Sequence, residues 1–153
     1  MDIYFKLSIF GIMMPATAVR KSPRQAQVTD AGQAGAGLRT FQRIADQWKL
    51  SAADAMTLIG VDARSTYYEL LRRARESRDV KGLSKDQLDR LSYVLGIYHS
   101  IRVLFPHSTE TRDEWVSRAN TSSLFGGRPP LELMRSGMVG LYQTFAHLAA
   151  VRS

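Results

Sequence analysis

Apolar side chains recur at intervals of three and four residues along most of the chain after residue 37. The first such stripe consists of Leu38, Phe41, Ile44, Ala45 and Trp48. Later segments with this period lie at 52–60, 63–77, 85–105, 110–118, 131–134 and 138–151. The period places the apolar side chains on one face of an α-helix. No segment alternates convincingly between apolar and polar positions, as a strand would, so we predict an all-α fold.

Polar residues stand where the predicted helices begin. Ser51 and Asp62 precede two of them, and a side-chain oxygen at this position accepts a hydrogen bond from an unpaired N–H of the first turn. Ser84 and Gln87 have the spacing of a capping box ahead of the longest predicted helix. Pro106 follows that helix and cannot continue it.

The first 37 residues lack this helical period and are predicted to form a flexible N-terminal segment. Residues 1–14 are apolar and precede Ala16-Thr17-Ala18, a pattern that suits a short signal peptide with its cleavage site. The alternative is a start codon placed too far upstream, with Met13 or Met14 as the true first residue. Residues 15–37 are rich in Pro, Ala, Gly and Gln, which is typical of a linker.

The composition favours an anionic partner and excludes several kinds of chemistry. Twenty-one Lys and Arg against 14 Asp and Glu give the 153-residue chain a formal charge of +7. There is no cysteine, which excludes a disulfide framework, a thiolate nucleophile and a Cys-containing zinc site. His99, His107 and His147 lack metal-ligand spacing, and no apolar run reaches the ~18 residues of a membrane span. We also find no nucleophile elbow, so we predict neither an enzyme nor a bound metal or cofactor.

The two helices within 51–77 have the order of a helix-turn-helix, with the tight turn at Gly60-Val61 between them. The second helix directs Ala63, Tyr67, Leu70, Leu71 and Ala74 inward by its period. Its opposite face carries the candidate DNA-binding residues Arg64, Ser65, Tyr68, Arg72 and Arg75. Arginine suits guanine edges and phosphates, whereas hydroxyl groups suit either phosphates or bases. The alternative is an ordinary solvated helix without a DNA role.

Both halves of residues 38–153 resemble one family. In the first half the matching stretches are GVDARSTYYELL at 60–71 and LSKDQLDRLSYVL at 83–95. In the second half the ordered matches are Trp115, Arg118-Ala119-Asn120, Leu124, Gly126-Gly127-Arg128, Pro130-Leu131-Glu132-Leu133 and Gly137. The chain thus resembles Xre/MbcA/ParS-type antitoxins, in which the second set belongs to the toxin-binding domain.

This resemblance implies a helix-turn-helix domain over 38–105 and a small helical toxin-binding domain over 106–153. It implies a cytoplasmic homodimer that binds operator DNA and a toxin, commonly a RES-domain protein that degrades NAD. The antitoxin would occlude the toxin active site and repress its own operon. The candidate toxin-binding residues are Trp115, Asn120, Leu124, Gly127, Leu148, Val151, Arg152 and Ser153.

Three questions remain open from the sequence. The chain could be a stand-alone helix-turn-helix regulator, or an interaction module whose helix-turn-helix has no DNA role. The apolar stripe that includes Tyr142 and Phe145 could seal a homodimer or belong to the core. The basic end at Arg152 could enter a toxin pocket for an anionic dinucleotide, or it could be a frayed terminus.

Overall fold

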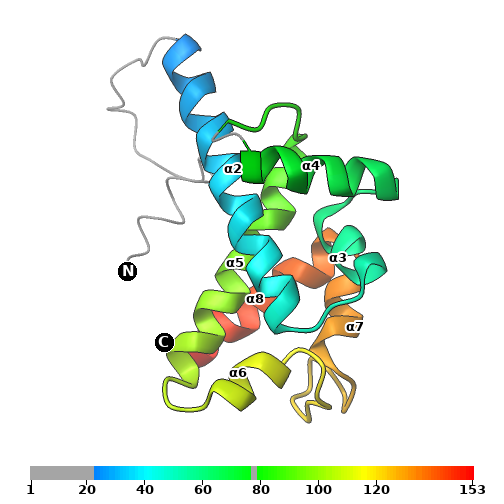
Figure 1. Cartoon of the computed structure of the whole chain (residues 1–153). Helices are drawn as coiled ribbons and strands as arrows, with labels where there is room; N and C mark the ends of the chain where they lie inside the picture. Colours follow the sequence, from blue (N-terminus) through cyan, green and yellow to red (C-terminus); the bar gives the residue numbers. More distant parts are fainter. Residues whose placement is uncertain (1–22, 77–78) are drawn as a thin grey trace.

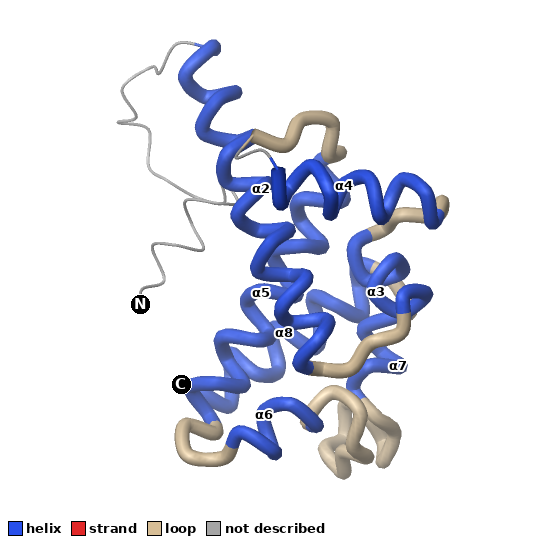
Figure 2. The backbone as a smooth tube through the Cα atoms, in the orientation of Figure 1, coloured by secondary structure: helices blue, strands red, loops and turns tan. Residues whose placement is uncertain are grey.

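The computed structural model describes residues 23–76 and 79–153, with side chains from residue 32 onward. Within these residues the regular structure is entirely α-helical, as the apolar period predicts (Figures 1 and 2). The helices are α2 (Pro23–Gln47), α3 (Ala52–Ile59), α4 (Arg64–Glu76), α5 (Lys85–Leu104), α6 (Thr109–Glu114), α7 (Pro130–Arg135) and α8 (Met138–Arg152).

Helix α2 corrects the predicted linker over its described part, because residues 23–37 are helical. Small residues explain the error. Gly35 and Gly37 are buried, and a Cβ built on Gly37 would lie 2.9 Å from Leu91 of α5. Around Gly35 and Gly37 the helix therefore gains its contacts through close approach of the backbone, whereas its later turns use the large apolar side chains from Leu38 onward. The possible signal peptide and the alternative start sites lie outside the described residues.

Helix α5 is central to the packing. It contacts α2, α3 and α8, and Figure 1 shows it between α2 and the C-terminal α8. Val94, Ile97 and Ile101 of this helix are fully buried. One connected apolar core joins Leu38 and Phe41 of α2 to residues of every longer helix. The broad apolar face predicted for residues 85–105 is therefore confirmed, because α5 has neighbours on several sides.

The C-terminal helices belong to this same core. Met134 of α7, with Leu141 and Leu148 of α8, is buried in the connected cluster. Gly140 lies where α8 meets the end of α7, and a Cβ built there would lie 1.9 Å from the Leu133 carbonyl oxygen. Thr144, also fully buried, satisfies its hydroxyl by donating to the Gly140 carbonyl at 2.9 Å. The regions before and after residue 105 thus share one apolar interior.

The capping predictions are right at two helices and wrong at one. The Ser51 side chain accepts from the Asp54 N–H at 3.0 Å, and Ser84 and Gln87 form the reciprocal capping box. Asp62 does not occupy the cap position of α4. The first helical bond runs from the Tyr67 N–H to the Ala63 carbonyl, which places Ala63 at the cap. For the same reason Ala63 is exposed and not inward-facing.

Candidate functional site

Helices α3 and α4 form the predicted helix-turn-helix, and a glycine closes the turn. Gly60 has φ +69°, in the left-handed region that favours glycine. Its N–H donates to the Thr57 carbonyl at 3.3 Å, and the Val61 N–H donates to the Met56 carbonyl at 3.0 Å. These two bonds make a Schellman ending, which stops α3 and redirects the chain into α4.

The first turns of α5 hold this turn in place. The Gln87 side chain, which already closes the capping box, also donates to the Gly60 carbonyl at 3.2 Å. A Cβ on Gly60 would lie 3.0 Å from the Arg90 side chain. Arg90 itself is fixed by Asp86 at 2.7 Å. The start of α4 is therefore positioned by the C-terminal end of α3 and by α5.

The outer face of α4 carries all five candidate DNA-binding residues. Arg64, Ser65, Tyr68, Arg72 and Arg75 are exposed. The inward stripe is buried at Tyr67, Leu70, Leu71 and Ala74. At the far end of the helix, the Arg39 guanidinium of α2 donates to the Ala74 carbonyl at 2.8 Å, which secures α4 against α2. The predicted division between an inner and an outer face is confirmed, apart from Ala63.

The arginines of this face differ in their electrostatic surroundings. Arg72 pairs with Glu69 at 2.8 Å and also with Glu76. The hydrogen bond from Arg72 lowers the pKa of the Glu69 carboxyl, with the positive charge of the guanidinium contributing. Arg64 and Arg75 have no acidic partner among the described residues. Positive charge available to a phosphate or a base is thus greatest at those two positions.

Two tyrosines adjoin at the start of α4. The rings of Tyr67 and Tyr68 meet edge to face at 5.3 Å, with Tyr67 buried and Tyr68 half exposed. Burial raises the pKa of the Tyr67 hydroxyl, and Tyr68 and Asp46 raise it further. Tyr67 therefore stays neutral and supports the exposed Tyr68 ring from below.

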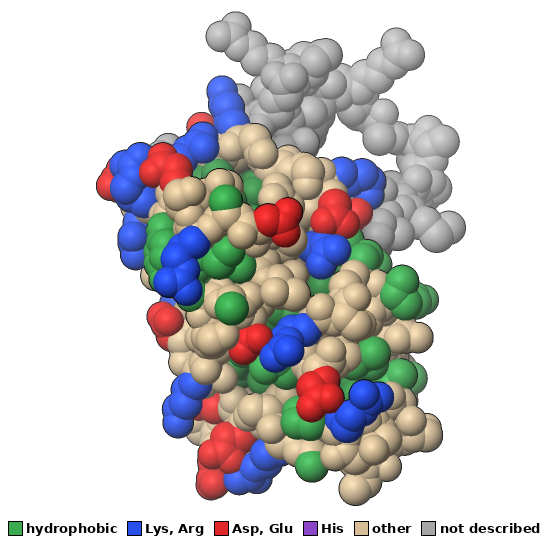
Figure 3. Space-filling view, turned by 90° about the vertical axis from the view of Figure 1, so that its right-hand side faces the viewer, with side chains coloured by type: hydrophobic (Ala, Val, Ile, Leu, Met, Phe, Trp, Pro, Cys, Tyr) green, Lys and Arg blue, Asp and Glu red, His purple; other side chains and the backbone are tan. Residues whose placement is uncertain are grey.

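On the face turned toward the viewer in Figure 3, Lys and Arg alternate with Asp and Glu, so the charge is mixed.

The segment between α6 and α7 is an ordered loop whose own residues set its shape. The side-chain oxygen of Asn120 accepts a hydrogen bond from the Ser122 N–H at 3.0 Å, and the backbone carbonyl of Asn120 accepts one from the Gly127 N–H at 2.9 Å. Gly126 and Gly127 both have positive φ. Trp115 meets Phe125 edge to face at 5.8 Å. Trp115 and Asn120 thus have structural roles, whereas Leu124 is partly exposed and Gly127 is exposed.

Phe125 joins this loop to α8, a connection that the sequence analysis missed. Its ring is 2% exposed and contacts His147 of α8 edge to face at 5.4 Å. The only sequence feature that could have indicated it is a large aromatic residue directly before two glycines. The contact packs the loop against the second half of α8.

The end of α8 contains both core and surface residues. Leu148 is 2% exposed because it faces the shared core, so its side chain is not on the surface where the sequence places a toxin contact. Val151 is 58% exposed, and the Ser153 hydroxyl donates to the Ala149 carbonyl at 2.9 Å. Arg152 lies near His99 of α5. Burial lowers the pKa of that histidine, and the positive charge of Arg152 lowers it further.

The apolar stripe of α8 is divided in the same way. Leu141 is buried, Phe145 is partly buried and Tyr142 is 53% exposed. Tyr142 and Phe145 both contact the Tyr93 ring of α5, at 5.9 and 5.7 Å. The core thus accounts for Leu141 and Phe145 of this stripe, whereas Tyr142 is half exposed although its ring meets Tyr93.

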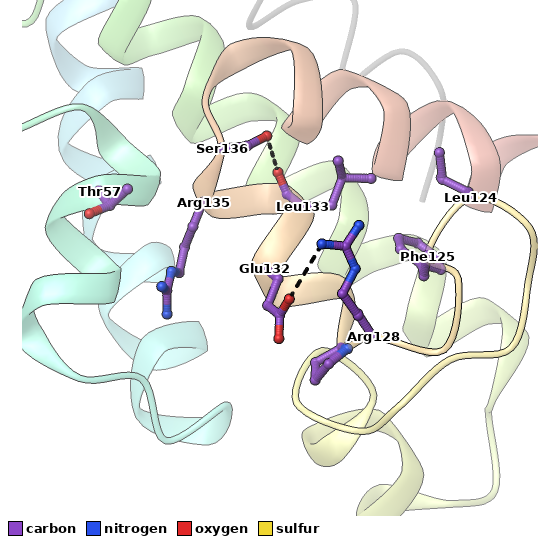
Figure 4. A pocket seen from close by; sticks show the side chains of 9 residues that line it. Thr57, Leu124, Phe125, Arg128, Glu132, Leu133, Arg135 and Ser136 are labelled. Atoms are coloured by element: carbon purple, nitrogen blue, oxygen red, sulfur yellow. Dashed lines mark hydrogen bonds and ion pairs between the residues drawn. The ribbon is translucent and has the colours of Figure 1, made fainter.

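A cleft of about 680 Å³ lies between α3 and the C-terminal region (Figure 4). Thr57 lines it from α3, and Leu124 and Phe125 line it from the loop. Its charged residues are Arg128, Glu132 and Arg135. Arg135 pairs with Asp54 of α3 at 2.9 Å, which ties α7 directly to the helix-turn-helix. The sequence analysis did not identify this cleft, because α3 and α7 are brought together only by the tertiary fold.

Two comparisons with known proteins bear on this arrangement. Residues 27–96 match the family model of the antitoxin Xre-like helix-turn-helix domain. The chain is also 34% identical over 125 residues to the uncharacterized protein y4oB of Sinorhizobium fredii (strain NBRC 101917 / NGR234). That alignment covers 81% of this chain and 90% of the relative. The chain belongs to the Xre-like antitoxin family.

Membership confirms the resemblance found in the sequence. The protein is an antitoxin with a DNA-binding helix-turn-helix domain, and its family consists of regulators that are not enzymes. The matched region begins inside α2, so it includes residues whose composition suggested a linker. Among the described residues, no helix is long and apolar enough to cross a membrane. That part of the chain also has no group of three or more His, Asp and Glu residues able to hold a metal ion.

Proposed function

We propose that this antitoxin binds a RES-type, NAD-degrading toxin and occludes its active site with the C-terminal surface. The observation that carries the proposal is the contact of Phe125 with His147. Val151 lies one helical turn beyond His147 and therefore on the same face of α8. The ordered loop and the exposed helix end thus form one continuous surface on which a partner could dock.

The charge at the helix end suits the proposed target. Arg152 stands in the last turn of α8, and the helix continues to this residue without interruption. A toxin site that binds the phosphates of a dinucleotide attracts a guanidinium group, which forms charge-assisted hydrogen bonds with such anions. In this proposal Val151, Arg152 and Ser153 enter the mouth of the toxin site, while the loop carrying Leu124 and Gly127 contacts its rim.

Removal of residues 149–153 tests occlusion while leaving the buried Leu148 in place. The toxin encoded beside the antitoxin is co-expressed with the full chain or with the shortened chain, and growth and cellular NAD are measured. We expect the full chain to protect the cells and the shortened chain to leave NAD depleted. The control is Val139→Ala, a substitution at the exposed start of α8, and this variant should still protect the cells. Full protection by the shortened chain would contradict occlusion by the helix end.

We further propose that the protein represses its own operon as a homodimer. The supporting features are the exposed outer face of α4 and the hydrogen bond from α5 to the turn that precedes α4. Two recognition helices related by a two-fold axis match the two half-sites of a palindromic operator. A mobility-shift titration with the protein's own promoter at two salt concentrations tests this. Affinity should fall as salt rises, because phosphate contacts release counterions. An affinity for the promoter that does not change with salt concentration would contradict the proposed phosphate contacts.

A further inference from the structure

The cleft between α3 and residues 124–136 combines apolar side chains with charged ones. Leu124, Phe125 and Leu133 supply apolar side chains. Of the charged residues that line it, two are arginines and one is a glutamate, and Asp54 beside the cleft pairs with Arg135, which leaves Arg128 as the arginine that a partner can reach. A volume of about 680 Å³ lies within the range of about 300–1,000 Å³ that is usual for binding pockets.

The two arginines differ in how firmly they are held. Arg135 is paired with Asp54 at 2.9 Å. Arg128 approaches only Glu132, at 4.0 Å, and its side chain is 75% exposed. Figure 4 shows the Arg128 and Glu132 side chains over the centre of the cleft. An exposed ion pair at this separation contributes little stability, so Arg128 can exchange its partner at small cost.

We propose that this cleft is a second docking site for the toxin, and that it receives an acidic side chain next to an apolar one. The inference rests on the proposed function, because it assigns part of the toxin contact. In the complex the carboxylate pairs with Arg128, and the apolar side chain covers Leu124 and Leu133. The formal charge of +7 on the chain also favours an acidic partner surface.

The character of the lining favours a protein over DNA as the occupant. A phosphate contact needs cations and N–H donors, and it gains nothing from a floor of leucine and phenylalanine. A protein side chain gains from both features, because it removes apolar surface from water as it satisfies the arginine. Thr57 of α3 forms one wall, so the occupied cleft brings the toxin into contact with the helix-turn-helix.

The test compares Arg128→Glu with Arg43→Glu. Arg43 is an exposed arginine of α2 that does not line the cleft. The affinity of each purified full-length variant for the separately purified toxin is measured by calorimetry. We expect Arg128→Glu to weaken binding about tenfold or more, and Arg43→Glu to leave it unchanged. Arg128→Lys should retain most of the affinity, because it keeps the charge. Equal melting temperatures of the variants exclude misfolding as the cause.

Each of the other outcomes contradicts the proposal that the toxin docks in this cleft. Unchanged toxin affinity of Arg128→Glu overturns the docking proposal and leaves the proposed function standing. Loss of operator binding with intact toxin binding shows instead that Arg128 contacts DNA, which also overturns it. If the unaltered chain does not bind the toxin, both this site and the proposed function fail.

Discussion

The helix-turn-helix and the C-terminal region present their candidate binding residues in different ways. On α4, all five residues predicted to contact DNA are exposed. Of the residues predicted to contact a toxin, Leu148 is buried in the core, Trp115 packs on Phe125 and Asn120 bonds within its loop. An amphipathic helix separates its functional face from its packing face by period. A loop without that period uses its distinctive side chains to set its own conformation.

This difference decides which substitutions report on function. A change on the outer face of α4 alters charge and hydrogen bonding while the inward stripe remains intact. A change at Trp115, Asn120 or Leu148 alters the scaffold first, and toxin binding only as a consequence. The residues of the C-terminal region that can be replaced without loss of fold are those with exposed side chains, such as Arg128 and Val151.

The largest expected effect is at Leu148, whose position in the core separates structure from contact. Leu148→Ala should lower the free energy of unfolding by about 3 kcal/mol, because it leaves a cavity between α8 and its neighbours. Urea unfolding followed by circular dichroism measures this. The control, Val151→Ala, should change stability by no more than about 0.5 kcal/mol. A stable Leu148→Ala variant that loses only toxin binding would show that Leu148 is a direct contact.

A smaller effect is expected where α7 meets α8. Gly140→Ala places a Cβ against the Leu133 carbonyl, so the two helices must separate, at a cost of about 2 kcal/mol in unfolding free energy. Thermal melting measures the change. Gly32→Ala in α2 is the matched control, because its Cβ would meet only Asp79, at 3.6 Å. That substitution should stabilise the protein by up to about 1 kcal/mol. Equal effects at the two glycines would contradict the close packing of α8.

On α4, replacing an arginine without an acidic partner in the described part of the chain should lower operator affinity more than replacing the ion-paired Arg72. Arg64→Ala should cost about 1–3 kcal/mol if Arg64 contacts a base. Arg72→Ala should cost less, because Glu69 and Glu76 already hold this guanidinium. Mobility-shift titration of the purified variants measures both, and unfolding curves of each variant should match the unaltered protein. A larger loss from Arg72→Ala would show that its ion pairs open on DNA and that Arg72 contributes more to operator binding than Arg64.

The smallest effect concerns the pKa of His99, which reports the position of the helix end. Burial and the charge of Arg152 lower this pKa, so the unfolded chain binds a proton at a higher pH than the folded protein. Stability therefore falls as pH drops below the ordinary histidine value of about 6.5. Arg152→Gln should raise the His99 pKa, as measured by NMR titration. An unchanged value would place the end of α8 away from α5.

Several features of the fold follow from short stretches of sequence. The capping box of Ser84 and Gln87 needs only residues three apart, and Pro130 begins α7 as its fixed φ favours. Gly60 ends α3 because few other residues adopt its backbone conformation. The two faces of α4 follow from the apolar period. In each case the atoms that interact lie within one or two helical turns, so the local pattern contains the necessary information.

Tertiary structure decided the features that depend on distant segments. The start of α2 was predicted as a linker because small residues give no apolar period, yet they allow close approach to α5. Leu148 and Val151 differ in burial although both are apolar and three residues apart, since the described neighbours of α8 cover Leu148 and leave Val151 exposed. The cleft arises where α3 and α7 meet through Asp54 and Arg135. The sequence by itself thus determined the helices from residue 38 onward and the outer face of α4, whereas burial against remote neighbours determined which residues remain available to a partner.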